Sequence, residues 1–482
     1  PPPPAAPGSA RPRRAPRPQA LGGGGTAPEL LELDAGSPAH GGFCVARKDD
    51  DPTGVVVLVR HCLPGERVRA RVTARASRVW YAEAVEVLRA SPDRVSPVWA
   101  EAGPGGVGGG ELSHVALGAQ RTWKRWVLAD CLRRIGGGDV VQAVEALPGA
   151  APGQAVAVEA LPSELAAQAS DDPRTRARAG TRTRTRVSLE VTAQGRAGMH
   201  GFRSGQVLEV RQLPLAVAPI QQLGLTQDRR WRHHYRPGAR LTAVAPSTGE
   251  PLVVVGEEVL TARARPTGRR RVTEVVDATA LGLGELRYHV HVGGFWQVHR
   301  DAPRVLTERV VRAVVEDHPA AAGGHPGPGA LRADGLRVLE LYSGSGLLTL
   351  PLAALGARVT CLEGSAQAVA DARRNLHDHP DARLVTGAVT ADSVTELGSS
   401  FGPGRGADVV VLDPPRRGAG RQVVEAVAAL GPSRVVLVAC DPAALARDLA
   451  AFLGLGFRLG DLAALDMFPH THHLEAVAVL IR

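Results

Sequence analysis

The sequence lacks any pattern that would pair its cysteines. The five cysteines are scattered along 482 residues without a C-x-x-C motif, at positions 44, 62, 131, 361 and 440. An odd, scattered set is neither a disulfide framework nor a zinc site, and it is typical of a reducing compartment. The chain also lacks an apolar run approaching the roughly 18 residues of a membrane span. Its Pro-rich start has no apolar stretch of a secretory signal. These absences predict a cytoplasmic protein with no membrane association, and we expect a monomer.

Acidic residues are in deficit. Lys and Arg number 57 against 48 Asp and Glu, so the formal net charge is +9. A basic surplus suits a polyanionic partner, because each cation set against a phosphate releases a condensed counterion. Arg far outnumbers Lys, so a GC-rich genome that encodes Arg freely offers a second explanation. The charge therefore favours nucleic acid as a partner without establishing it.

The composition and hydrophobic pattern of the sequence change along the chain. Its length suggests about three domains. Residues 1–26 are rich in Pro, Arg and Gly, which predicts a disordered tail. Residues 27–93 contain about five short apolar or alternating runs cut by Gly and Pro, which predicts a small β-barrel of the OB type. Residues 94–290 are predicted to form a β-rich central region. Residues 291–482 alternate strands with helices, which predicts an α/β domain with a Rossmann-like, doubly wound parallel sheet.

Two features stand out in the central region. A stretch over 119–135 has helical spacing, with Trp123, Trp126, Val127 and Leu132 predicted on one face and cations on the other. Further on, six arginines alternate with other residues over 174–186. At the period of a strand, most of these guanidinium groups would share one face and could grip a phosphate backbone. A solvated edge or loop is the alternative, and the sequence does not separate the two.

A glycine turn in the C-terminal region predicts a nucleoside cofactor. Gly344 and Gly346 follow the apolar run VLEL, and glycines there let the backbone approach a ligand. Glu363 ends the next strand about 20 residues later, where it can accept hydrogen bonds from a ribose. NAD is the competing ligand, but its fingerprint wants a third glycine where this chain has Thr349. The pattern therefore favours S-adenosylmethionine.

The next two predicted strands each end in a residue of chemical interest. Asp413 closes the run VVVLD and precedes two prolines, which would hold its carboxylate at the ligand edge of the sheet. An ordinary Asp-Pro surface turn is the alternative. Cys440 closes RVVLVAC at the same edge. A buried core thiol is the alternative for Cys440 and the expected state of Cys361, which lies inside its strand.

The segment from Asp466 to Glu475 reads DMFPHTHHLE. Three histidines suggest a metal, but a cluster on one short loop without a separated ligand is poor zinc geometry. We therefore predict no metal site and favour local hydrogen bonds or RNA contact. Glu475 leads into an apolar strand, which is an expensive place for an idle charge.

Together these segments resemble the RNA uracil-C5 methyltransferase family, which makes 5-methyluridine in tRNA and 23S ribosomal RNA. The matching segments are GFWQV (294–298), ELYSGSG (340–346), LEGS (362–365), DPPR (413–416), ACDPAALARDL (439–449) and FPHTHHLE (468–475). The N-terminal segment similarly resembles the TRAM domain of many members.

The resemblance implies S-adenosylmethionine-dependent methylation of uridine C5 in rRNA or tRNA. It places the nucleophile on Cys440, the general base on Glu475, and the cofactor contacts on Gln297, Tyr342, Glu363 and Asp413. A differently targeted methyltransferase and a catalytically silent RNA-binding homologue are the alternatives.

One departure from the family is plain. Many members carry a four-cysteine iron–sulfur site after the TRAM domain, including a C-G-G-C element. Here Val107 and Gly110 stand where two of those cysteines would be, and residues 94–120 contain no cysteine. Because thiolates are the usual ligands of such clusters, we predict that no iron–sulfur cluster is bound. The fold of residues 94–150 is left open.

Overall fold

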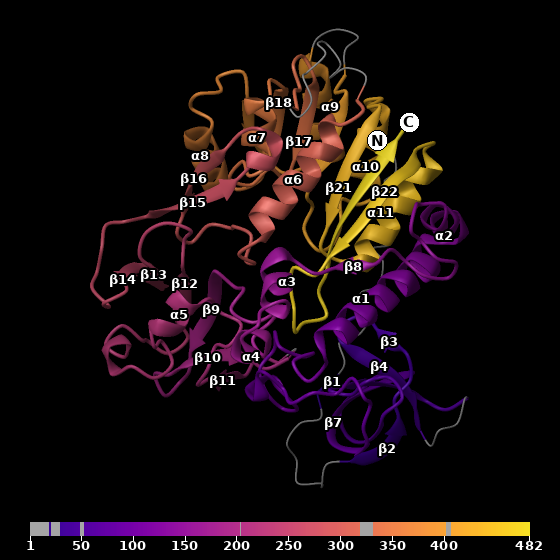
Figure 1. Cartoon of the computed structure of the whole chain (residues 1–482), viewed down its shortest axis with the longest axis vertical. Coiled ribbons are helices and arrows are strands. Elements are labelled where there is room, and N and C mark those ends of the chain that lie inside the picture. The colour runs from indigo at the N-terminus through magenta and orange to yellow at the C-terminus, as the bar shows by residue number, and fades with distance from the viewer. Residues whose placement is uncertain (1–18, 21–28, 49–52, 203, 319–330, 402–405) are drawn as a thin grey trace, which may run out of the picture. The chain divides into compact units, whose positions relative to one another are not determined.

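The computed structural model of the chain describes residues 19–20, 29–48, 53–202, 204–318, 331–401 and 406–482 (Figure 1). The chain forms two compact units, Pro1–Arg94 and Val95–Arg482. Of the tail predicted over 1–26, only Gln19–Ala20 (β1) is described, and the rest lies outside the described residues. In the described parts of the chain, no helix is long and apolar enough to cross a membrane.

The first unit is β-rich, and its main strands are the five expected from the sequence. They are β2 Leu30–Asp34, β4 Phe43–Arg47, β5 Val56–Arg60, β6 Arg67–Arg75 and β7 Val79–Arg89, joined by the two-residue strands β1 and β3 Pro38–Ala39. Their order is β1-β6-β7-β5-β4-β3, and β2 also pairs with β6. Residues of β6 alternate as its sequence RVRARVTAR predicts, with Val68 and Ala70 fully buried between outward arginines.

The second unit contains three early helices. They are α1 Leu117–Cys131, α2 Gly138–Glu145 and α3 Pro162–Gln168. In the C-terminal sheet, α1 contacts β8 Val158–Glu159 and α2 contacts β22 Arg458–Leu465. The face predicted for α1 is partly wrong: Trp123 and Val127 are buried, but Trp126 is 55% exposed and Lys124 is fully buried. Lys124 turns inward because its ammonium group meets Asp466 Oδ1 at 2.5 Å, a partner that periodicity cannot reveal.

The central region contains a six-stranded antiparallel sheet of order β11-β10-β9-β12-β13-β14. Its strands are β9 Arg186–Val191, β10 Ala197–His200, β11 Val207–Glu209, β12 Arg240–Val244, β13 Leu252–Val255 and β14 Glu258–Thr261. The core beneath it includes Trp231, which is fully buried, and α5 Ala218–Gln222 contributes Ile220. A hairpin of β15 Arg271–Asp277 and β16 Glu285–His291 follows.

Over the arginine-rich run 174–186, the sequence leaves both a strand face and a loop open. Asp172 and Pro173 start the short helix α4 Pro173–Arg176, and strand β9 begins only at Arg186, so the run does not form one strand. The Asp172 side chain accepts hydrogen bonds from the first N–H groups of that helix, and proline fits its first turn. The β-rich expectation is not met over residues 154–161, which contain only the short strand β8 Val158–Glu159, and β8 joins the C-terminal sheet beside β22.

The C-terminal residues confirm the predicted doubly wound α/β sheet. Its strands are β17 Arg337–Leu341, β18 Arg358–Glu363, β19 Arg383–Thr386, β20 Val409–Leu412, β21 Arg434–Ala439, β22 Arg458–Leu465 and β23 Glu475–Ile481. Its helices are α6 Ala302–Val315, α7 Thr349–Ala354, α8 Ala366–Asn375, α9 Ala391–Gly398, α10 Arg421–Ala429 and α11 Pro442–Gly454. Every residue of β20 is buried, as expected for a strand covered on both faces.

The strand order β19-β18-β17-β20-β21-β23-β22-β8 positions the candidate site. The chain winds outward in one direction from β17 and in the other from β20, so the topological switch point lies between these two strands. Ligands of such sheets bind outside the carboxyl ends of the strands at that point. Strand β23 is antiparallel to both of its neighbours, so it begins where the parallel strands end.

Candidate active site

The glycine turn after β17 presents an open backbone at the edge of the sheet. Tyr342, which follows β17 directly, has φ 65°, and Gly344 has φ 57°. The Gly344 N–H donates to Glu363 Oε2 at 3.0 Å, and the Ser365 N–H donates to Oε1 at 2.7 Å. A Cβ added at Gly344 would meet nothing within 4 Å. The turn therefore fixes the Glu363 carboxylate and leaves room for a ligand to approach the backbone.

Asp413 stands one strand further along the same edge. It follows β20, and its N–H donates to the Leu341 carbonyl at 3.3 Å. Burial and the nearby charge of Glu363 raise the pKa of Asp413 to about 7. Two carboxyl groups so close together favour a ligand that brings positive charge and hydrogen-bond donors. S-adenosylmethionine, with its sulfonium charge, ribose hydroxyls and amino group, fits this acceptor set.

Gln297, the other predicted cofactor contact, lies between β16 and α6. In the described residues no hydrogen bond joins its side chain to the sheet edge. Its neighbour Trp296 packs on Tyr288, with ring centroids 5.1 Å apart, and the Tyr288 hydroxyl donates to the Leu347 carbonyl at 3.0 Å. These contacts tie the segment that carries Gln297 to the loop before α7.

Cys440 and Glu475 come together through the register of the sheet. Ala439 pairs with Ala476 at the junction of β21 and β23, so the next residues across the strands are Cys440 and Glu475. Burial raises the pKa of Cys440 to about 12, assisted by the charges of Glu475 and Asp413. Burial and the charge of Asp413 likewise raise the pKa of Glu475 well above its usual range. A thiol and a carboxyl group thus face each other at the ligand edge.

Cys361 shows the opposite environment in the same sheet. Its side chain is 1% exposed inside β18, and its thiol lies 3.8 Å from Glu340 Oε2 and 3.5 Å from the Thr349 hydroxyl. Burial raises the pKa of Cys361 well above its usual value. The prediction that Cys361 is a core thiol is confirmed, whereas Cys440 is only half-buried.

Arg416 also belongs to the site, although no role was predicted for it. It follows Asp413 and two prolines, and its charge lowers the pKa of both Cys440 and Glu475, against the stronger effect of burial. Its side chain is exposed, and its Nη2 donates to His473 Nε2 at 3.2 Å. Nothing in the local sequence indicates this contact, because the partner lies 57 residues away.

The loop that leads into Glu475 is held by a segment from far earlier in the chain. Leu112 N–H donates to the His470 carbonyl at 3.0 Å, and His470 N–H donates to Gln120 Oε1 at 2.7 Å. Lys124 adds the buried ion pair with Asp466 and a hydrogen bond to the Phe468 carbonyl at 3.0 Å. The loop 466–474, which leads into Glu475, is therefore held by residues from before and within α1.

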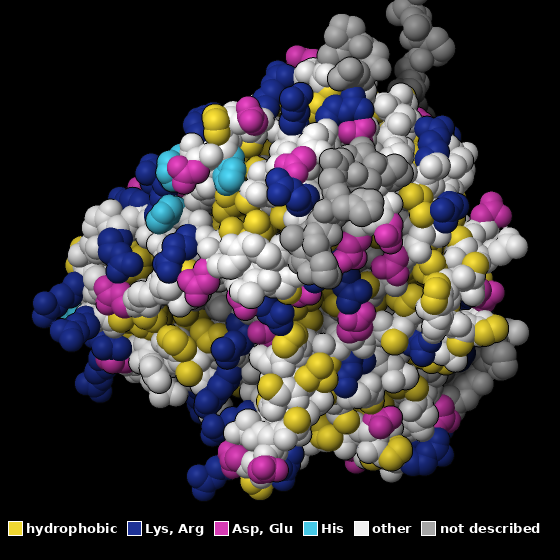
Figure 2. All heavy atoms as spheres, turned by 45° about the horizontal axis from the view of Figure 1, so that its top comes forward, with side chains coloured by type: hydrophobic (Ala, Val, Ile, Leu, Met, Phe, Trp, Pro, Cys, Tyr) yellow, Lys and Arg dark blue, Asp and Glu magenta, His cyan; other side chains and the backbone are white. Residues whose placement is uncertain are grey.

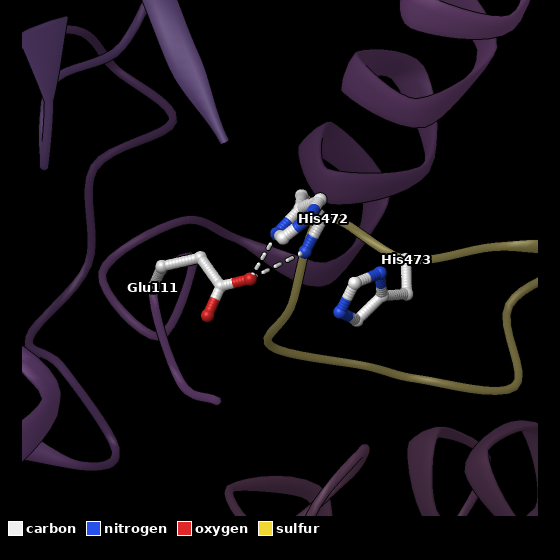
Figure 3. Close-up of side chains that lie close together, drawn as sticks. All are labelled: Glu111, His472 and His473. Carbon is white, nitrogen blue, oxygen red and sulfur yellow. Dashed lines mark hydrogen bonds and ion pairs between the residues drawn. The ribbon is translucent and has the colours of Figure 1, made fainter. Parts of the chain in front are cut away.

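The segment before α1 also contains Glu111, an acidic residue far from the histidines in sequence that lies beside them in the structure. Glu111 hydrogen-bonds the ring of His472, and His473 lies beside it (Figure 3). One ligand atom from each of the three residues lies within 4.8 Å of the others. The expectation that the histidines lack a ligand from elsewhere in the chain is therefore wrong.

The positions predicted to have lost cluster cysteines are packed with other groups. Val107 is 1% exposed within the core beneath the central sheet. A Cβ at Gly110 would lie only 2.7 Å from the Trp99 ring and 2.8 Å from Ala102. Side chains thus crowd the place where a thiolate at residue 110 would begin.

Relatives cover nearly the whole chain. An uncharacterized RNA methyltransferase of Streptomyces avermitilis is 37% identical over 94% of this chain and 98% of its own length. A 23S rRNA (uracil(1939)-C(5))-methyltransferase of Chromohalobacter salexigens is 32% identical over 92% of this chain and 88% of its own. The chain belongs to the RNA uracil-C5 methyltransferase family. The resemblance read from its motifs is thereby confirmed.

Two further comparisons agree with membership of this methyltransferase family. A family model described as tRNA (uracil-5-)-methyltransferase matches residues 405–482, the part of the chain that contains Asp413, Arg416, Cys440 and Glu475. The crystal structure of Pyrococcus abyssi tRNA (uracil-54, C5)-methyltransferase superposes with a TM-score of 0.59 at 21% identity, over 93% of this chain and all of the other. This methyltransferase therefore shares its fold with that enzyme.

Proposed function

We propose that this methyltransferase transfers a methyl group from S-adenosylmethionine to C5 of a uridine in rRNA or tRNA, through a covalent adduct with Cys440. The observation that carries the proposal is the facing pair of Cys440 and Glu475 beside the acidic edge at Glu363 and Asp413. Relatives named for uracil-C5 methylation of 23S rRNA support the substrate class.

The acidic edge would bind and orient the cofactor. Glu363, fixed by the Gly344 and Ser365 N–H groups, is placed to accept from ribose hydroxyls. Tyr342 follows β17 and Asp413 follows β20, and Gln297 lies on the segment tied to the loop before α7. These three residues would contact the remaining parts of the cofactor. When bound, S-adenosylmethionine supplies an electrophilic methyl group and a positive charge.

Cys440 would make the uracil ring nucleophilic. C5 of uracil is too weak a nucleophile to take a methyl group directly, but addition of a thiolate at C6 turns the ring into an enolate with electron density at C5. A thiol with a pKa near 12 needs help to ionise. The Arg416 guanidinium supplies positive charge toward both the thiolate and the enolate.

Glu475 would complete the reaction. After C5 has taken the methyl group, its remaining proton must leave so that the C6–sulfur bond breaks and the C5–C6 double bond returns. A buried carboxylate with a raised pKa is a strong base once ionised, which suits abstraction of a carbon-bound proton. The thiol is then released for another turnover.

The central region offers a surface for the RNA backbone. Figure 2 shows Lys and Arg side chains gathered at the side of the molecule where Figure 1 places β12–β14. Exposed arginines before β12 include Arg229, Arg232 and Arg236, which have no carboxylate partner among the described residues. Such cations suit phosphate contacts. The target uridine would have to leave its stack to reach Cys440.

The proposal is tested with RNA that contains 5-fluorouridine. Fluorine replaces the proton that Glu475 would remove, so the wild-type protein with S-adenosylmethionine should accumulate a stable protein–RNA adduct. Cys440→Ala should give no adduct, and Cys361→Ala, the matched core-thiol control, should retain it. Absence of the adduct in the wild type, or its persistence in Cys440→Ala, contradicts the mechanism and favours a silent RNA-binding homologue.

We further propose that the protein works as a monomer without an iron–sulfur cluster. The absence of a cluster is supported by the residues themselves, since Val107 and Gly110 carry no thiolate, Val107 is packed in the core, and a Cβ at Gly110 would meet Trp99 and Ala102. Iron and sulfide assays on anaerobically purified protein test it. Stoichiometric iron with the absorbance of a cluster would contradict the proposal.

A further inference from the structure

Glu111 is a buried, ionised carboxylate outside the reacting groups. It is 2% exposed, and its Oε1 accepts hydrogen bonds from the backbone N–H of His472 at 3.1 Å and from the ring Nδ1 of the same residue. Its Oε2 accepts from the Gly109 N–H at 3.2 Å. Burial opposes its charge, but the hydrogen bond and charge of His472 hold the pKa of Glu111 far below its usual value. The carboxylate therefore fixes the orientation of the His472 ring.

His472 in turn packs on His473. The two ring centroids lie 4.0 Å apart, and the Phe468 ring packs edge-on with His473 at 5.9 Å. Burial, with the charges of His472 and Arg416, lowers the pKa of His473 to about 3. A neutral His473 ring can accept the hydrogen bond that Arg416 donates to its Nε2 at 3.2 Å.

Arg416 depends on this contact for its position. Its side chain is exposed, and its one hydrogen bond within the described part of the chain is to His473. A long, exposed side chain without an anchor samples many rotamers. The charge that reaches Cys440 and Glu475 is therefore set by where His473 holds the guanidinium group.

The three residues Glu111, His472 and His473 are also of the types that bind metals (Figure 3). Two guanidinium groups oppose a divalent cation there. Arg416 already uses the Nε2 lone pair of His473, and Arg184, which donates to the Gly109 carbonyl at 2.8 Å, acts on Glu111 with its charge. The contacts favour a hydrogen-bonded chain over a metal centre.

We propose that Glu111 is a positioning residue of the methyl-transfer site, which acts through His472 and His473 to hold Arg416 against Cys440 and Glu475. This inference rests on the proposed function for its purpose, but its test requires neither RNA nor cofactor. Glu111 directly follows Gly110, so the proposal gives a role to the segment in which the cysteines of the iron–sulfur site are absent.

The test measures the rate at which iodoacetamide alkylates Cys440 in the full-length protein over a range of pH, by peptide mass spectrometry. Cys440 is the half-exposed thiol, and the four others are buried. Its thiolate is influenced by Glu475, Asp413 and Arg416. Removal of the nearby cation in Arg416→Gln should raise its apparent pKa and lower the rate at a given pH about tenfold. Glu111→Gln should lower it about threefold or more.

A double-mutant cycle separates positioning from a general structural effect. In the Arg416→Gln background, Glu111→Gln should cause no further loss of alkylation rate, because Glu111 acts on Cys440 through the Arg416 guanidinium group, which is then absent. Glu164→Gln, which removes another buried carboxylate beside α1, should leave the rate unchanged. If thermal unfolding shows that Glu111→Gln loosens the fold, His473→Ala should reproduce the loss and His473→Gln, which keeps an acceptor, should restore much of it.

Three results would overturn the inference. One is a wild-type alkylation profile in Glu111→Gln. Another is an equal loss from Glu111→Gln with and without Arg416. The last is stoichiometric zinc in the wild-type protein that disappears in Glu111→Gln. If the 5-fluorouridine adduct fails to form while the cycle shows coupling, the proposed function fails and the positioning chain stands.

Discussion

Two arginine-rich segments of the central region differ at one point, because the first ends in a buried arginine and the second does not. In the segment 174–186, Arg186 turns inward, is 8% exposed and pairs with the buried Glu274 at 3.3 Å. In the segment 229–240, Arg229, Arg232 and Arg236 stay exposed, and Figure 2 shows blue side chains gathered on that side. Spacing singled out the first segment for phosphate contact and missed the second. The difference teaches that a buried acid elsewhere in the chain decides which arginines remain available to a partner.

The largest expected effect is on stability, at Arg186. Arg186→Met would leave Glu274 as an uncompensated buried charge and should cost about 3–5 kcal/mol of unfolding free energy. Chemical denaturation followed by circular dichroism measures it. Arg240→Met, in the paired strand β12 but exposed, is the matched control and should cost far less. Equal losses in the two variants would remove the contrast between inward and outward arginines.

An intermediate effect is expected on RNA binding, at the outward segment. Replacing Arg229, Arg232 and Arg236 together by Gln should weaken RNA binding about tenfold at moderate salt and reduce the slope of log affinity against log salt by about 2–3. Filter binding at several salt concentrations measures both. Unfolding should be nearly unchanged. Unaltered affinity would show that the RNA path lies elsewhere.

The smallest effect is expected at the exposed start of the first segment. Arg174, Arg176 and Arg178 lie beside Asp171 and Asp172, and Arg176 is held by the carbonyls of Ser170 and Asp171 at 2.6 and 2.9 Å. Replacing all three by Gln should change RNA affinity less than about twofold and stability by about 0.5 kcal/mol. A loss as large as that of the outward segment would support the alternative in which the arginines of 174–186 also contact phosphate.

The positions of the principal site residues could be predicted from the sequence because each ends an apolar strand. Glu363 ends β18, Asp413 follows β20 and Cys440 follows β21. In a parallel sheet those ends meet at one edge, so local runs suffice to bring the residues together. The fold class followed from the same alternation of strands and helices.

The remainder of the site depends on contacts that no local pattern contains. Glu111 reaches His472 across 361 residues, and Lys124 reaches Asp466 across 342. Helical periodicity assigned Lys124 to the solvent and Trp126 to the core, but Lys124 is buried in its ion pair with Asp466 and Trp126 is exposed. Arg416 lies within the DPPR motif. Its hydrogen bond to His473, 57 residues away, cannot be predicted from that motif.

The antiparallel strand β23 has a consequence for how the protein is made. The ribosome delivers β21 first and β22 next, yet in the finished sheet β23 lies between them. The two earlier strands must stand apart, or part again, until β23, which follows both in the chain, inserts. Glu475 is the first residue of that strand, so completion of the sheet and arrival of the proposed base are one event. Under the proposed mechanism, a chain without β23 would keep the thiol of Cys440 and lack the group that releases it from RNA.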